Sequence, residues 1–140
     1  MKVVFDTNFF VLHYFSKDGE IASKTRAVLN SCRKLGNRGF LPTIVVGEFY
    51  AISQKWAGRD VAGKNFKEMI NSGLNIVEMT AEISRQAAIF RMEYKEDIPW
   101  GDCIIAATAL LHGADVVVTE DPHFKQIGEI KAKTLSELRI

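Results

Sequence analysis

The sequence has few of the residues that mark disulfide-rich, zinc-binding or disordered proteins. Its 140 residues include only 3 prolines and 2 cysteines, Cys32 and Cys103, which lie far apart and form no CxxC or Cys/His motif. These features exclude a disulfide scaffold and a zinc finger. We expect the two cysteines to be free thiols of an intracellular, cytoplasmic protein.

Neither a surplus of one charge nor a long apolar run is present. The 18 basic residues are balanced by 17 acidic ones, which excludes a polybasic protein that binds nucleic acid by charge alone but leaves open an enzyme with a local basic groove. The longest apolar stretches, such as Phe9 to Leu12 and Cys103 to Ala107, fall far short of the ~20 residues of a membrane span. Asp6 and Asn8 interrupt the first apolar segment, unlike a signal peptide. We therefore expect no membrane partner.

The pattern that is present alternates between strands and helices along the whole chain. A hydrophobic content of 47% with 25% charged residues is typical of a globular protein, and we expect one domain over residues 1–140. The alternation predicts an α/β fold whose central parallel sheet, of about five strands, is covered on both faces. Function in such folds gathers beyond the carboxyl ends of the strands. The expected strands are 2–5, 40–42, 75–79, 115–119 and 130–133, and the expected helices are 21–35, 44–56, 60–72, 80–94 and 99–112.

Two acidic residues lie where expected strands end. Asp6 follows the strand at 2–5, and Asp121 follows the strand at 115–119. An aspartate at such a position is as typical of a turn or a helix N-cap as of a functional site, so neither residue indicates a site by itself. Glu120 competes with Asp121 for the same role, but its side chain is expected to point the other way.

Glu48 interrupts the apolar pattern of the helix expected at 44–56. Its neighbours at helical spacing include Ile44 and Ile52, which predicts a carboxylate on an apolar face. Burying a carboxylate is costly unless it is paired or bound to a metal. The alternative is a residue at the edge of the stripe that pairs with Lys55 or Arg59.

Asp102 is the strongest single signal, because it is the only charged residue between Asp97 and Asp115. The helix around it is apolar on nearly all sides and is expected to be buried. An acid in the first turn of a helix can be stabilised by free backbone amides and the helix dipole. That alternative does not explain why so apolar a helix begins with a charge, and we favour a functional role.

Together these four acids predict a metal site. Carboxylates that meet in one pocket repel one another and stay partly protonated unless a cation lies among them. Oxygen ligands without histidine or cysteine favour magnesium or manganese over zinc. Such ions serve phosphodiester hydrolysis. The four predicted site residues are Asp6, Glu48, Asp102 and Asp121.

At these residues the sequence resembles the PIN-domain family, and within it the VapC-type toxins of toxin–antitoxin pairs. No single motif is specific, but order, spacing and total length all fit, and the resemblance covers essentially the entire chain. The motifs are Val4-Phe5-Asp6-Thr7-Asn8, Val46-Gly47-Glu48-Phe49, Trp100-Gly101-Asp102 and Val118-Thr119-Glu120-Asp121 with Phe124.

The resemblance implies a three-layer α/β/α fold and a ribonuclease that depends on one or two Mg²⁺ or Mn²⁺ ions. It assigns Asp6 and Asp102 as principal metal ligands, with Glu48 and Asp121 completing the pocket and positioning the attacking water. It also implies an RNA substrate, products with a 5′-phosphate, a small antitoxin that covers the acidic pocket, and a homodimer. The supporting polar positions, which orient the carboxylates, are Thr7, Asn8 and Thr119.

One residue departs from the family pattern, and two other functions compete with the ribonuclease. His123 stands where arginine or aspartate is often found next to the phenylalanine; we expect it to be a surface residue, with a contact to RNA as the alternative. A phosphotransfer enzyme with Asp6 as nucleophile is disfavoured because Asn8 stands where a second aspartate is needed. A PIN-like module that binds metal or RNA without cleavage also remains, although the presence of all four acids favours catalysis.

Overall fold

The computed structural model of the chain describes residues 1–94 and 97–140. Five parallel strands form one sheet in the order β3-β2-β1-β4-β5. The α/β fold with a five-stranded parallel sheet is therefore confirmed. The strands are β1 Lys2–Phe5, β2 Arg38–Pro42, β3 Asn75–Val77, β4 Val116–Val118 and β5 Ala132–Lys133.

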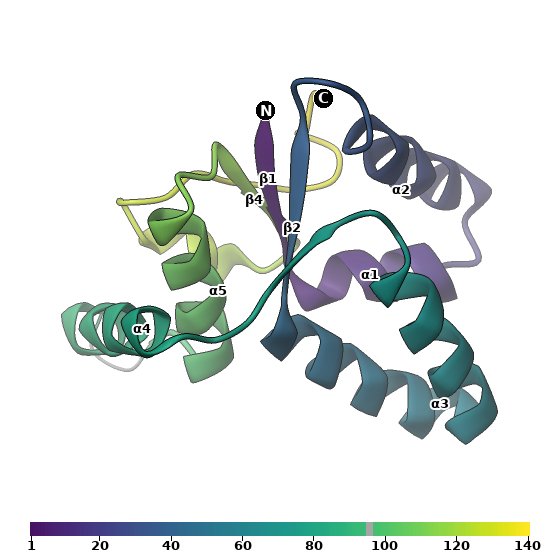
Figure 1. Cartoon of the computed structure of the whole chain (residues 1–140), viewed down its shortest axis with the longest axis horizontal. Coiled ribbons are helices and arrows are strands. Elements are labelled where there is room, and N and C mark those ends of the chain that lie inside the picture. The colour runs from purple at the N-terminus through teal and green to yellow at the C-terminus, as the bar shows by residue number, and fades with distance from the viewer. Residues whose placement is uncertain (95–96) are drawn as a thin grey trace.

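Helices cover both faces of the sheet and give three layers. Helices α1, α2 and α3 lie on one side, and α4 and α5 lie on the other (Figure 1). Among residues 1–94 and 97–140, no helix combines the length and the apolar character that crossing a membrane requires. The helices are α1 Thr7–Phe15, α2 Gly19–Ser31, α3 Thr43–Ile70, α4 Ala81–Glu93, α5 Trp100–Leu111 and the 3₁₀ helix η1 Pro122–Gln126.

The centre of the sheet consists of β1 and β4, which are buried on both faces. In their register Val3 pairs with Val116 and Phe5 with Val118, and each of these side chains is almost fully buried. The chain runs outward from β1 to β2 and β3 and then crosses back to β4 on the other side of β1. This reversal leaves a crevice at the carboxyl ends of β1 and β4, which is where parallel sheets most often bind ligands.

Helix α1 is an element that the sequence pattern did not predict. Asp6 forms its N-cap, and the helix begins directly at Thr7. Phe9 and Phe10 are buried while Tyr14 and the other apolar residues of the helix pack partly against the core. Because apolar side chains surround the helix, no helical stripe is visible in the sequence.

The end of one helix also differs from the prediction, whereas the break expected at Gly58 is present. Helix α2 ends at Ser31 and not near Leu35, because the amides of Arg33 and Lys34 turn back to the carbonyls three residues earlier; Leu35 is fully exposed. The two helices expected on either side of Gly58 are confirmed: α3 consists of two helical segments that meet at a kink at Gly58. Gly58 has φ 86° and ψ 173°, a conformation that only glycine adopts without strain.

Candidate active site

A pocket of about 260 Å³ opens at the carboxyl ends of β1 and β4. The starts of α1, α3 and α5 and the segment after β4 all reach it, so residues far apart in the sequence meet there. Within residues 1–94 and 97–140, no lysine or arginine is among the residues that line it. The lining residues are Asp6, Thr7, Asn8, Val11, Glu48, Ile52, Asp102 and Asp121.

Asp6 is fixed at the base of this pocket by two hydrogen bonds. The Thr7 amide donates to its Oδ1 at 2.7 Å, and the Thr119 hydroxyl donates to its Oδ2 at 2.6 Å. Asp6 is only 5% exposed, and burial raises its carboxyl pKa, although the two hydrogen bonds oppose the shift. The residue is thus both the N-cap of α1 and a pocket carboxylate, and the two interpretations of its position do not exclude each other.

Glu48 lies in the second turn of α3 and faces the same pocket. The Thr7 hydroxyl donates to its Oε1 at 2.8 Å. A Cβ atom at position 101 would lie 3.1 Å from its Oε2, so the glycine there lets α5 approach the carboxylate closely. The expectation of a buried carboxylate is corrected: Glu48 is exposed, because this face of α3 opens into the pocket. Within the described residues, no ion pair joins it to Lys55 or Arg59.

Asp102 enters the pocket from the first turn of α5, with 16% of its side chain exposed. In the described part of the chain its buried Oδ2 has no hydrogen-bond partner. Burial, followed by the charges of Asp6 and Asp121, raises the pKa of the Asp102 carboxyl to about 8. The position therefore disfavours the charged form.

Asp121 lies between the end of β4 and the start of η1. It is positioned by Thr119, the same residue that binds Asp6. Its amide donates to the Thr119 hydroxyl at 2.9 Å, and its Oδ1 accepts the His123 amide at 2.9 Å. Glu120 points away from the pocket, as expected, since its Oε1 accepts the Leu135 amide at 2.8 Å. The Glu120 amide donates to Asn8 Oδ1 at 3.2 Å, which ties α1 to the segment after β4.

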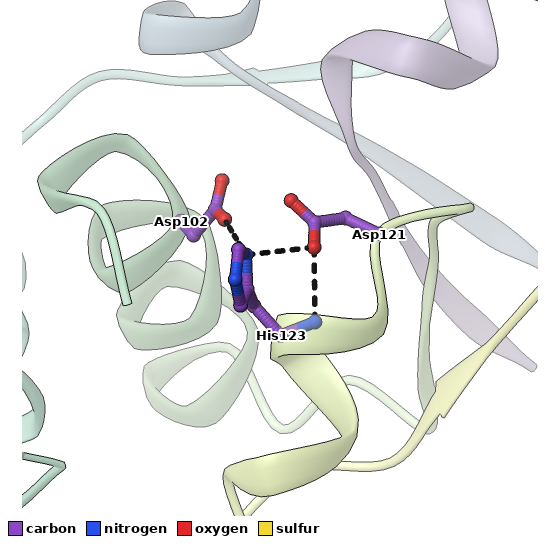
Figure 2. A group of neighbouring side chains, drawn as sticks. All are labelled: Asp102, Asp121 and His123. Carbon is purple, nitrogen blue, oxygen red and sulfur yellow. Dashed lines mark hydrogen bonds and ion pairs between the residues drawn. The ribbon is translucent and has the colours of Figure 1, made fainter. Parts of the chain in front are cut away.

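His123 lies at the surface, as expected, but its ring also approaches two of the site carboxylates. Its ring lies between the carboxylates of Asp102 and Asp121 (Figure 2). The Nδ1 atom is 2.9 Å from Asp121 Oδ1 and 3.8 Å from Asp102 Oδ2. Although 41% of the side chain is exposed, Nδ1 itself is buried. The ring is thus exposed on one side, and its Nδ1 faces the carboxylates because the Asp121 cap of η1 turns residue 123 toward α5.

Comparison with known proteins places this arrangement in a family. The family model of the PIN domain matches residues 3–130. The chain belongs to the PIN-domain family. Among curated proteins, none matches the sequence significantly.

Solved structures share the fold of this PIN domain at low sequence identity. VapBC from Salmonella typhimurium, bound to DNA, gives a TM-score of 0.76 with 19% identity over 96% of this chain and 98% of that one. VapBC2 from Rickettsia felis, bound to a promoter fragment, gives 0.75 with 19% identity over 96% and 98%. Mycobacterium tuberculosis VapC20, described as a toxin that cleaves the sarcin–ricin loop, gives 0.74 with 16% identity over 90% and 95%. At these identities the similarity shows the fold.

The pocket of the PIN domain has the chemistry of a divalent-cation site. Its four carboxylates come from four different elements, and in the described part of the chain no lysine or arginine lines the pocket to neutralise them. Asp102, Asp121 and His123 each offer one ligand atom, and these atoms lie within 4.8 Å of one another. A cation in the pocket would lower the raised carboxyl pKa values of Asp6 and Asp102, because it stabilises their charged forms, and it would give Asp102 Oδ2 a partner.

Proposed function

We propose that this PIN domain is a metal-dependent endoribonuclease and the toxin of a toxin–antitoxin pair. The observation that carries the proposal is the convergence of four carboxylates on one pocket, in whose lining the described residues place no cationic side chain. Asp6 and Asp102 are the principal ligands of one or two Mg²⁺ or Mn²⁺ ions, and Glu48 and Asp121 complete the set. When bound, the metal lowers the pKa of a water and neutralises charge on the phosphate that is cleaved.

The other polar residues keep these carboxylates in place. The Thr119 hydroxyl contacts both Asp6 and Asp121, so it couples the ends of β1 and β4. The Thr7 hydroxyl orients Glu48, whose exposed carboxylate is placed to position the attacking water. Water as the nucleophile predicts RNA products with a 5′-phosphate.

The structural neighbours support the RNA substrate and the protein partner. VapC20 from Mycobacterium tuberculosis is described as a toxin that cleaves the sarcin–ricin loop. Other neighbours are a toxin–antitoxin complex from Klebsiella pneumoniae and VapBC-1 from nontypeable Haemophilus influenzae. We extend these properties to the present chain as part of the proposal, with an antitoxin that covers the acidic pocket. A homodimer is part of the same proposal, and light scattering of the purified protein tests it.

Induced expression in bacterial cells tests the toxin and the nuclease together. The wild-type chain should arrest growth and leave a specific RNA cut at defined positions. Asp121→Asn should do neither, because it removes a metal ligand. Glu120→Gln is the matched control: it changes the neighbouring acid, whose side chain points out of the pocket, and should behave as wild type. Equal RNA cleavage by Asp121→Asn and the wild type would contradict the proposal.

A further inference from the structure

Two buried polar atoms lie close together beside the pocket without a hydrogen bond between them. They are Nδ1 of His123 and Oδ2 of Asp102, which lie 3.8 Å apart, and neither has a hydrogen-bond partner within the described residues. The contact of Nδ1 with Asp121 Oδ1, at 2.9 Å, is close, but it lacks hydrogen-bond geometry. Buried polar atoms nearly always have a partner, so two unpaired atoms this close together indicate that a further group binds between them.

The spacing of these atoms is compatible with the ligands of a metal ion. Two adjacent ligands of an octahedral ion with bonds of about 2.1 Å are about 3.0 Å apart. The separation of Nδ1 from Asp121 Oδ1, 2.9 Å, equals this spacing within 0.1 Å, and the separation from Asp102 Oδ2, 3.8 Å, is wider and would have to shorten when an ion binds. Figure 2 shows that the ring and both carboxylates converge on the same space from α5 and η1.

The backbone around His123 holds the ring in this place. The His123 amide donates to Asp121 Oδ1 at 2.9 Å, which makes Asp121 the N-cap of η1. Pro122 begins the 3₁₀ helix and restricts the chain between the two side chains. The His123 imidazole and the Asp121 carboxylate are therefore held next to each other by one short segment of restricted backbone.

We propose that His123 is a metal ligand through Nδ1 and that it makes this site select Mn²⁺ over Mg²⁺. The inference rests on the proposed function, because it concerns the same metal site. Both ions take oxygen ligands, but Mn²⁺, as the softer transition ion, accepts an imidazole nitrogen beside them more readily than Mg²⁺, which is a hard cation and retains several waters. A site of carboxylates alone lacks this additional preference.

Calorimetric titration with Mn²⁺ and with Mg²⁺ tests the selectivity. His123→Gln should weaken Mn²⁺ binding by about tenfold or more, on the scale of changes at metal-site residues, and change Mg²⁺ binding by less than about threefold, since Mg²⁺ gains little from nitrogen. His112→Gln is the matched control, because that imidazole bonds the Thr108 carbonyl at the end of α5 and should leave both affinities unchanged. An equal loss for both ions in His123→Gln would overturn the selectivity.

Pulsed electron paramagnetic resonance of the bound Mn²⁺ tests the ligand directly. The wild type and His112→Gln should show nitrogen modulation from a coordinated imidazole, and His123→Gln should lack it. Mn²⁺ bound without nitrogen modulation in the wild type would overturn the role of His123 while leaving the proposed nuclease intact. Failure of the wild type to bind either ion would overturn both, so the two outcomes are distinguishable.

Discussion

The metal-free protein should become less stable as the pH rises, and Asp102→Asn should remove most of this effect. The pKa of the Asp102 carboxyl is about 8 in the folded protein, against an ordinary value of 3.8. Between these values the folded protein binds a proton that the unfolded chain has lost, so the free energy of unfolding falls with rising pH. The stability is fully present below about pH 4 and is lost progressively up to about pH 8.

The size of the effect follows from the shift. At about 1.4 kcal/mol per pKa unit, a shift of about four units sets a ceiling near 6 kcal/mol. Asp102 retains 16% exposure of its side chain, so water screens part of the cost and we expect about 2–3 kcal/mol between pH 5 and pH 8. In the Asp102→Asn variant the free energy of unfolding should still fall with pH, but less steeply, because burial also raises the carboxyl pKa of Asp6.

Urea unfolding with a chelator, at several pH values from 5 to 8, measures this slope. Asp102→Asn should be more stable than the wild type at pH 8 and nearly equal to it at pH 5. Glu120→Gln should follow the wild type, because Glu120 lies outside the pocket. Added Mn²⁺ should restore the stability of the wild type at pH 8 by binding the folded state. Wild-type stability that is constant or rises from pH 5 to 8 without metal would rule out this linkage.

Three other substitutions probe the supports of the pocket and the fold. Gly101→Ala places a Cβ 3.1 Å from Glu48 Oε2, so it should displace that carboxylate and reduce RNA cleavage about tenfold or more with little change in Tm. Thr119→Val removes the hydroxyl shared by the two strand ends; it should lower the free energy of unfolding by about 1–3 kcal/mol in urea and weaken Mn²⁺ binding about 10- to 100-fold in calorimetry. Gly58→Ala strains the kink of α3 at φ 86° and should cost about 1–3 kcal/mol in thermal unfolding while leaving RNA cleavage by the folded protein unchanged. Wild-type RNA cleavage by Gly101→Ala would contradict the role of the close approach to Glu48. Wild-type Mn²⁺ affinity in Thr119→Val would contradict the role of the shared hydroxyl, and wild-type thermal stability of Gly58→Ala would contradict the role of the kink.

Much of the fold could be predicted because the signals are local and repeated. The strand at 2–5 and the strand at 115–119 are short, apolar and followed by acids, as central parallel strands are. Helix α1 could not be predicted, because its apolar residues lie on all sides and form no apolar stripe at helical spacing. The end of α2 could not be predicted either, because the turn at Arg33 and Lys34 depends on backbone hydrogen bonds that no residue pattern indicates.

The carboxylates of the candidate site could be predicted because the topology brings strand ends together. Asp6 and Asp121 follow adjacent strands, β1 and β4, so their meeting follows from the parallel sheet. The approach of the His123 ring to the carboxylates could not be predicted, because it depends on a cap and a short 3₁₀ helix whose direction is set by packing. A histidine two residues after a predicted metal ligand was the signal available for it.

Cleavage of pooled cellular RNA by the purified protein decides whether this chain is a metal-dependent ribonuclease. With Mn²⁺ or Mg²⁺ the wild type should cut RNA at defined positions and leave 5′-phosphate ends, and excess chelator should abolish the cuts. An Asp6→Asn preparation, folded to the same extent by circular dichroism, should leave the RNA intact. Cleavage that persists in Asp6→Asn or in excess chelator, or a folded and metal-loaded wild type that cuts no RNA, would contradict the proposed activity.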